Sequence, residues 1–117
     1  MKTIVAGGRY FTDALLLSRV LDEWMLSLTT QLTIVSGTAN GADKCGEQWA
    51  TTNAVKIKRF PAKWDEYGKS AGYRRNVEMA GYAEALIAFW DGKSKGTKHM
   101  IDIALDKGLI VEVVRYE

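Results

Sequence analysis

The sequence predicts an α/β protein of the Rossmann-like, three-layer type, in which a parallel sheet lies between two layers of helices. Short apolar segments alternate along the chain with segments whose apolar residues recur every three or four positions. Turns that contain glycine or proline separate these segments. A chain of 117 residues with 47% hydrophobic residues fits one such domain, so we expect residues 1–117 to fold as a single unit.

The first half of the chain is expected to form two strands and two helices. An apolar run at residues 1–6 stops at the Gly7-Gly8 turn and is typical of a buried strand. Apolar residues then recur at helical spacing, and Thr12 or Asp13 can cap the helix that they form. The other expected elements of this half are a strand over residues 31–36 and a helix over residues 42–53.

The second half repeats the alternation. A third strand begins near residue 54 and stops at Pro61. The aromatic and basic segment 62–72 is expected to be an irregular connection, and connections of that length are typically functional. The remaining elements are expected at residues 74–82 (helix), 84–90 (strand), 97–107 (helix, ended by Gly108) and 109–114 (strand), with a polar loop at 91–96.

This order of elements favours a five-stranded parallel sheet with strand order 3-2-1-4-5. Right-handed crossovers bring the loops that follow the strands to one edge of such a sheet. Ligands bind there, where the strand order reverses between the first and fourth strands. We therefore expect the segments 7–9, 36–43, 61–76 and 91–97 to surround one crevice.

Composition restricts the compartment and the kind of partner. A single cysteine, Cys45, cannot form an intramolecular disulfide, and with one histidine the chain lacks the residues for a Cys/His metal site. No apolar run reaches the roughly 18 residues of a membrane span, and the N-terminal run is too short for a signal peptide. We expect a cytoplasmic protein without metal, cofactor or membrane. The net charge of +2 disfavours a nucleic acid as partner.

Three loops of the predicted crevice join small residues at a strand end to the start of a helix. Free N–H groups and the positive end of the helix dipole make such a junction a phosphate site. The alternative is a capped strand-to-helix turn without a ligand. The loop at residues 92–97, with its lysines, favours phosphate binding, although it is not a Walker A loop. The candidate ligand-binding residues of these loops are Gly7, Gly8, Arg9, Ser36, Gly37, Thr38, Gly41, Asp43, Asp91, Ser94, Gly96 and Thr97.

The segment 61–76 adds a cation and aromatic rings. Arg75 can clamp an anion at the start of the helix, with Asn76 beside it. Trp64 and Tyr67 stand among polar residues and can stack on a base, although aromatic side chains more often belong to a core. His99 is expected on a helix surface and is a weak catalytic candidate.

Several short motifs, spread over nearly the whole chain, are informative as a set. They are Gly7-Gly8-Arg9, Ser36-Gly37 with Gly41-Ala42-Asp43, Pro61-Ala62-x-Trp64, Arg75-Asn76-x-x-Met79, and Trp90-Asp91-Gly92 with Gly96-Thr97. As a set they resemble the YspA/YpsA-related branch of the SLOG superfamily, some of whose members are phage-encoded. The superfamily also contains the DNA-processing protein Smf/DprA and the Lonely Guy enzymes. The resemblance implies a Rossmann-like fold, a nucleotide or nucleotide-derived ligand, and a homodimer or higher homo-oligomer.

Lonely Guy enzymes cut the N-glycosidic bond of nucleoside 5′-monophosphates, and the resemblance to them is partial. Arg75 and Met79 match one of their motifs, and Gly96-Thr97 matches another. Met100, however, stands at the position of their catalytic glutamate, and methionine cannot act as an acid or base. If the activity is present, Arg75 with Asp91 or Glu78 is the candidate catalytic set.

Three functions are therefore compared. The first is a protein that binds a nucleotide or nucleotide-derived ligand through phosphate-cradling loops. The second is a nucleoside 5′-monophosphate N-glycosidase in which another acid replaces the glutamate. The third is an accessory protein that binds nucleic acid through the basic segment 56–75.

Overall fold

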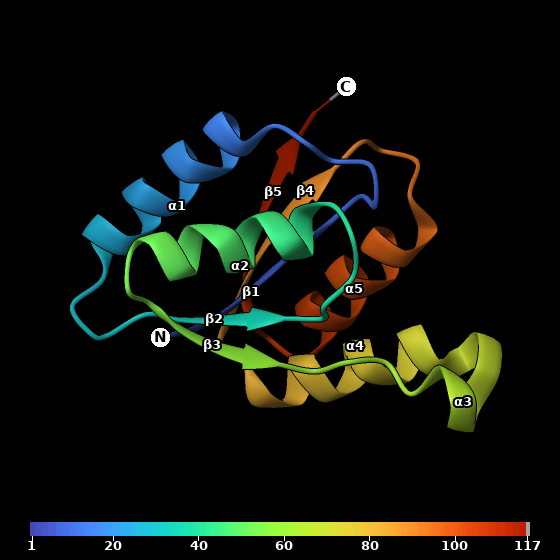
Figure 1. The fold of residues 1–117 in the computed structure, drawn as a ribbon. Coiled ribbons are helices and arrows are strands. Elements are labelled where there is room, and N and C mark those ends of the chain that lie inside the picture. The colour runs from blue at the N-terminus through green and yellow to red at the C-terminus, as the bar shows by residue number, and fades with distance from the viewer. Residues whose placement is uncertain (117) are drawn as a thin grey trace.

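Strands and helices alternate along residues 1–116, the part of the chain that the computed structural model describes (Figure 1). The chain order matches the predicted one, and the first strand lies at the centre of the sheet. The elements are β1 Lys2–Gly7, α1 Ala14–Ser27, β2 Thr33–Ser36, α2 Ala42–Thr52, β3 Lys56–Arg59, α3 Trp64–Tyr67, the 3₁₀ turn η1 Gly68–Ser70, α4 Ala71–Tyr82, β4 Ala85–Trp90, α5 Lys95–Asp106 and β5 Ile110–Arg115.

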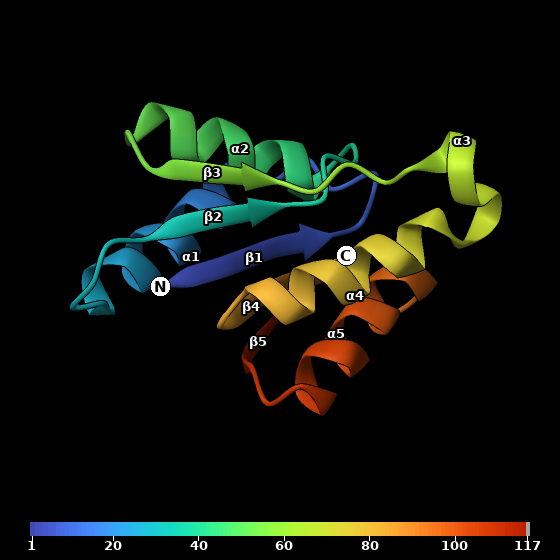
Figure 2. The same cartoon turned by 90° about the horizontal axis from the view of Figure 1, so that it is seen from below.

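All five strands are parallel and lie in the order β3-β2-β1-β4-β5, so the predicted fold class and strand order are confirmed. Helices α1 and α2 cover one face of the sheet, and α4 and α5 cover the other (Figure 2). Because successive side chains of a strand point to opposite faces, Val5 packs under α1 and α2 whereas Ile4 packs under α4 and α5. Because β1 and β4 are parallel neighbours, their carboxyl ends lie together at one edge of the sheet, between the two helical layers.

Capping side chains determine where two helices begin. Asp13 caps α1, as predicted, because its Oδ1 accepts a hydrogen bond from the N–H of Leu16 at 3.0 Å. Ser94 caps α5, and its Oγ accepts a hydrogen bond from the N–H of Thr97. Helix α5 therefore begins at Lys95, two residues earlier than the sequence pattern indicated.

The connection predicted to be irregular is mostly helical. Residues 64–70 form α3 and η1, and α4 begins at Ala71 rather than at residue 74. Gly68, with a positive φ of 56°, ends α3, while buried Ala71 packs the first turn of α4 against the protein. Figure 2 shows α3 beyond the carboxyl ends of the strands. This connection thus forms a wall at the sheet edge.

No helix within residues 1–116 has the length and apolar character that a membrane span requires.

Candidate functional site

A cavity of about 630 Å³ lies at the carboxyl edge of the sheet, where the strand order reverses. Its volume is within the roughly 300–1,000 Å³ of small-molecule sites. The loops after β1, β2 and β4 line it together with α3 and α4. The predicted ligand-binding residues that line it are Gly7, Gly8, Arg9, Asp43, Trp64, Arg75, Asn76, Asp91, Ser94, Gly96 and Thr97. The other predicted ligand-binding residues do not line the cavity; they are Ser36, Gly37, Thr38, Gly41 and Tyr67.

Helix α5 begins at this cavity, which Ser94, Gly96 and Thr97 line. Asp91 Oδ1 accepts hydrogen bonds from the N–H groups of Lys93 at 2.8 Å and Ser94 at 2.9 Å. The next two N–H groups, those of Lys95 and Gly96, donate to no acceptor within residues 1–116. Nothing lies within 4 Å of the position that a Cβ of Gly96 would take. An anion can therefore approach the positive end of the helix closely.

The Asp91 carboxylate is hydrogen-bonded to the backbone of its own loop. The two hydrogen bonds from Ser94 and Lys93 hold the pKa of its carboxyl below the usual value. The carboxylate is therefore ionised and already bonded, which suits it to shape the loop rather than to transfer a proton. The other predicted acid, Glu78, is exposed on α4 and does not line the cavity.

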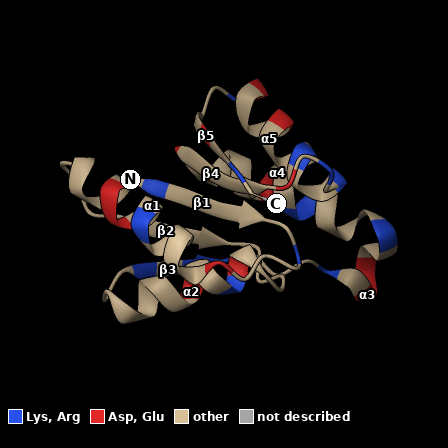
Figure 3. Ribbon diagram, turned by 90° about the horizontal axis from the view of Figure 1, so that it is seen from above, with Lys and Arg blue, Asp and Glu red and all other residues tan. Residues whose placement is uncertain are grey.

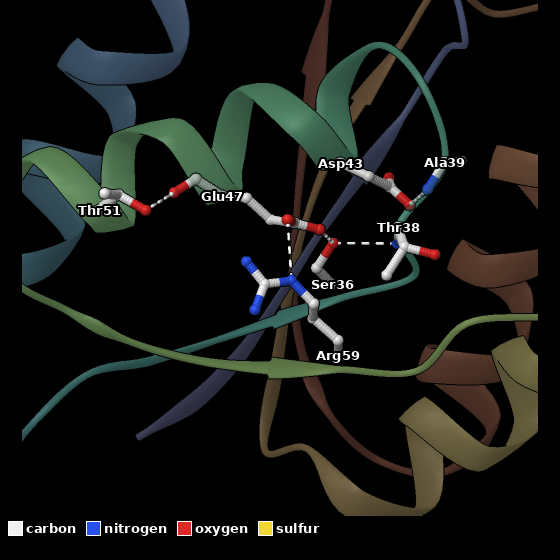
Figure 4. A network of polar contacts seen from close by, with 7 residues as sticks. All are labelled: Ser36, Thr38, Ala39, Asp43, Glu47, Thr51 and Arg59. Carbon is white, nitrogen blue, oxygen red and sulfur yellow. Dashed lines mark hydrogen bonds and ion pairs between the residues drawn. The ribbon is translucent and has the colours of Figure 1, made fainter.

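A network of side chains fixes the loop between β2 and α2 (Figure 4). Ser36 Oγ accepts the N–H of Thr38 at 3.0 Å and donates to Glu47 Oε2 at 2.6 Å. Glu47 Oε1 in turn accepts the Nε–H of Arg59 at 3.0 Å. Ser36 and Glu47 are buried, and both carboxylate oxygens of Glu47 are paired.

Two backbone N–H groups of this loop donate to side chains of the protein. The N–H of Thr38 is bonded to Ser36, and the N–H of Ala39 donates to Asp43 Oδ2 at 3.1 Å. The glycine that precedes α2, Gly41, packs against the backbone oxygen of Gly8. These two N–H groups of the loop are therefore bonded within the protein and are not free for a ligand.

Asp43 is a buried carboxyl group on the cavity wall, with 6% of its surface exposed. Its Oδ2 accepts the N–H of Ala39, while Oδ1 accepts no hydrogen bond from residues 1–116. Every fully buried side-chain polar atom of these residues has a partner, so Oδ1 is the oxygen that the cavity exposes. Burial raises the pKa of Asp43 to about 6, against the opposing effects of the Ala39 hydrogen bond and the Arg75 charge.

Two acceptors within the protein hold the guanidinium of Arg75. Its Nη1 donates to the carbonyl oxygen of Gly37, and its Nε donates to Asn76 Oδ1 at 3.1 Å. A Cβ at Gly37 would lie 2.6 Å from Arg75 Nη1 and 2.9 Å from Asp43 Oδ2. Gly37 is therefore needed so that Arg75 and Asp43 can approach one another, although it does not line the cavity itself.

Basic residues surround the cavity at the same edge of the molecule (Figure 3). Arg9 and Lys93 line it, and the structure pairs neither with an acid among the described residues. Lys69, at the start of the helical wall, also lines it. Sequence reasoning did not select Lys69 as a site residue, because its place depends on the unpredicted helical turn η1.

Aromatic and apolar side chains complete the lining. Trp64 is 55% exposed at the rim, whereas Tyr67 points away and lies under the guanidinium of Arg74 at 4.2 Å. The lining also includes two buried methionines, Met79 and Met100, and the latter stands where the Lonely Guy motif has its glutamate. The sequence did not single out Tyr10, which lines the rim next to Arg9. The lining thus combines cationic, aromatic and apolar side chains.

Comparison with known proteins adds three findings. The model of the YspA, cpYpsA-related SLOG family matches residues 1–67, more than half of the chain. The Gene 61 protein of Mycobacterium phage D29 is 32% identical over 94% of this chain and 93% of its own length. DNA processing protein A (DprA) from Streptococcus pneumoniae superposes with a TM-score of 0.76 at 20% identity. That match covers 99% of this chain but 50% of DprA, so the chain spans half the length of that protein, and the likeness is one of fold.

Proposed function

The chain belongs to the YspA, cpYpsA-related SLOG family, and on that premise we propose that it binds a nucleotide or nucleotide-derived ligand in the cavity at the sheet edge. The observation that carries the proposal is the start of α5, where the open N–H group of Gly96 belongs to the lining of a cavity that Arg9 and Lys93 also line. Backbone donors at a helix start match the several oxygens of a phosphate. Lys93 and Arg9 supply positive charge around the same volume.

The rest of the ligand would lie against the aromatic and apolar side chains of the lining. Trp64 offers an exposed indole face, and Met79 and Met100 form an apolar floor. A purine or pyrimidine ring can stack on an indole and cover such a floor. The volume of about 630 Å³ accommodates a base, a sugar and at least one phosphate.

Replacing Gly96 by aspartate tests this proposal. Open space at the Cβ position allows the change, and a carboxylate in the first turn of α5 favours folding while it repels a phosphate. We expect Gly96→Asp to keep or raise thermal stability and to weaken adenosine 5′-monophosphate binding in calorimetry by roughly tenfold or more. Gly81→Asp, also with open space at Cβ but on α4 outside the cavity, is the matched control. Equal affinities in all three proteins would contradict the proposal.

A second candidate function is hydrolysis of the N-glycosidic bond of a nucleoside 5′-monophosphate, which the position of Asp43 favours. A carboxyl group whose pKa lies near 6 is protonated often enough to donate a proton to the leaving base. Water then adds to C1′ and returns a proton to the carboxylate, giving ribose 5-phosphate and the free base. Of the acids on the cavity wall, Asp43 has the raised pKa, whereas Asp91 has a lowered one.

Chromatography of free base released from the common 5′-monophosphates and adenine-derived variants tests this candidate. Turnover should fall as pH rises through about 6 and should be lost in Asp43→Asn. Binding of these nucleotides without any base release would leave the protein as a binding protein.

A further inference from the structure

The single histidine of the chain, His99, lies on α5 outside the cavity and is connected to it through one buried amide. We propose that His99 is a positioning residue that holds Arg75 through Asn76, and that adding a proton to its imidazole loosens the anion site. The inference rests on the proposed function only for its effect on ligand affinity. The contacts that support it are present in the protein without a ligand.

Three contacts form the connection. The His99 ring packs edge-on against Tyr73 of α4, with ring centroids 4.5 Å apart and planes at 69°. Its Nδ1 lies 3.1 Å from Asn76 Nδ2. The Asn76 amide is 7% exposed, and its Oδ1 accepts the Nε–H of Arg75 at 3.1 Å. The imidazole, the amide and the guanidinium therefore form one hydrogen-bonded row that ends at the cavity wall.

The direction of each hydrogen bond in this row is determined. Arginine carries donors only, so Arg75 requires the oxygen of the Asn76 amide. The nitrogen of that amide, which is a donor, then faces His99 Nδ1. His99 must accept at Nδ1, so its proton sits on Nε2 and the imidazole is neutral.

A second proton on the imidazole means that the three side chains can no longer form both hydrogen bonds. Protonated Nδ1 and the amide nitrogen of Asn76 would be two donors facing each other at 3.1 Å. Rotating the amide would satisfy His99 but would turn the same nitrogen toward the donor of Arg75. Without rotation the contact between His99 and Asn76 is lost, and the amide that holds Arg75 loses its own anchor. With rotation Arg75 loses the amide oxygen and keeps one fixed acceptor, the carbonyl oxygen of Gly37.

The groups around His99 favour the neutral form. Burial lowers the pKa of His99 below its usual value, and the charge of Asp102 opposes this. Asp102 lies one turn further along α5 and is already paired with Lys98 at 2.8 Å. From α4, the side chains against the ring are uncharged Tyr73 and Asn76, with Arg75 behind the amide. The strands beneath α5 meet it through the apolar residues Met100, Ile101 and Ala104.

Nuclear magnetic resonance of the single imidazole tests the contacts without a ligand. We expect the Nε2–H tautomer at neutral pH and a pKa below the usual value of about 6.5. Asn76→Ala removes the donor to Nδ1, so it should raise that pKa. The Nδ1–H tautomer, or an unchanged pKa in Asn76→Ala, would overturn the proposal.

The Nε–H resonance of Arg75 shows whether the titration reaches the cavity. In an Asp43→Asn background, which removes the other group expected to titrate near pH 6, this signal should move with the pKa of His99. His99→Gln, whose side-chain oxygen can accept from Asn76 but cannot titrate, should abolish the movement. An Arg75 signal that titrates identically in His99→Gln would refute the coupling.

Calorimetry with adenosine 5′-monophosphate gives the effect on affinity. Between neutral pH and a pH below the pKa of His99, the affinity of the Asp43→Asn protein should fall roughly three- to tenfold, the equivalent of one hydrogen bond. The double variant with His99→Gln should lack this fall. Equal falls in both proteins would contradict a role for His99. If neither protein binds the nucleotide at any pH, the proposed function fails, while the imidazole and Arg75 signals still decide the positioning role.

Discussion

Replacing Asp43 by asparagine should make the protein more stable at neutral pH. Folding moves this carboxyl from water to a buried position and raises its pKa from 3.8 to about 6. A difference of about two pKa units corresponds to a cost of about 3 kcal/mol for ionised Asp43 in the folded protein. Asparagine avoids the charge and can still accept the N–H of Ala39, although more weakly. We therefore expect a net gain of about 2 kcal/mol at pH 7, or about 8 °C in melting temperature.

The pH dependence of this gain follows from the direction of the pKa shift. Between pH 4 and pH 6 the folded protein keeps the Asp43 proton that the unfolded chain has lost. The contribution of Asp43 to the free energy of unfolding therefore falls as pH rises through this range and is constant above it. The advantage of Asp43→Asn should disappear at pH 4 and reach its full size above pH 7.

Urea unfolding of both proteins from pH 4 to pH 8 measures this difference. All other titrating groups are common to the two proteins, so their effects cancel in the comparison. Asp106→Asn, at an exposed carboxylate at the end of α5, is the matched control and should change stability by less than about 0.5 kcal/mol. An Asp43→Asn protein that is no more stable than the parent at pH 7 would refute the assignment of a buried, costly charge. A confirmed gain would indicate that the protein keeps Asp43 for its site at the expense of stability.

Two further substitutions and two measurements on the parent protein have defined outcomes. Ser36→Ala leaves Glu47 Oε2 and the N–H of Thr38 without their partner and should cost about 1–3 kcal/mol in urea unfolding; an unchanged stability would contradict the network. Ser94→Ala removes the cap of α5 and should cost about 1 kcal/mol and weaken phosphate binding, whereas loss of stability with unchanged affinity would separate the cap from the ligand site. Oligonucleotide binding should be weak, and a steep dependence of strong binding on salt would instead favour the nucleic-acid alternative. Sedimentation should show a homodimer, and a monomer at all concentrations would contradict that expectation.

The architecture could be predicted because its signals are local. Each strand is a short apolar run, each following turn contains glycine or a capping residue, and the order of elements restricts the topology of a parallel sheet. The junction of a small-residue loop with the start of α5 was predictable for the same reason, since its small residues and its cap are neighbours in the chain. The segment 64–70 lacked such a signal, and its helical turns pack against each other and against α4, which is a tertiary contact.

Interactions between distant residues account for what the sequence did not show. The loop at residues 36–43 was a candidate phosphate site, but Ser36 and Asp43 occupy the N–H groups of Thr38 and Ala39. The raised pKa of Asp43 depends on burial that the folded chain creates. His99 is an ordinary helical residue in the sequence, and its partner lies 23 positions away on another helix.

The most direct measurement of the central claim is a titration of the backbone amides with adenosine 5′-monophosphate and, separately, with adenosine, followed by ¹⁵N-resolved nuclear magnetic resonance. We predict that the nucleotide shifts the amide signals of Lys95 and Gly96 most, because these N–H groups would receive the phosphate. Adenosine should leave these two signals nearly unchanged while it shifts the indole signal of Trp64. Amide signals at the start of α5 that stay fixed across a panel of nucleoside phosphates, dinucleotides and cyclic nucleotides would contradict the assignment of this helix as the phosphate site.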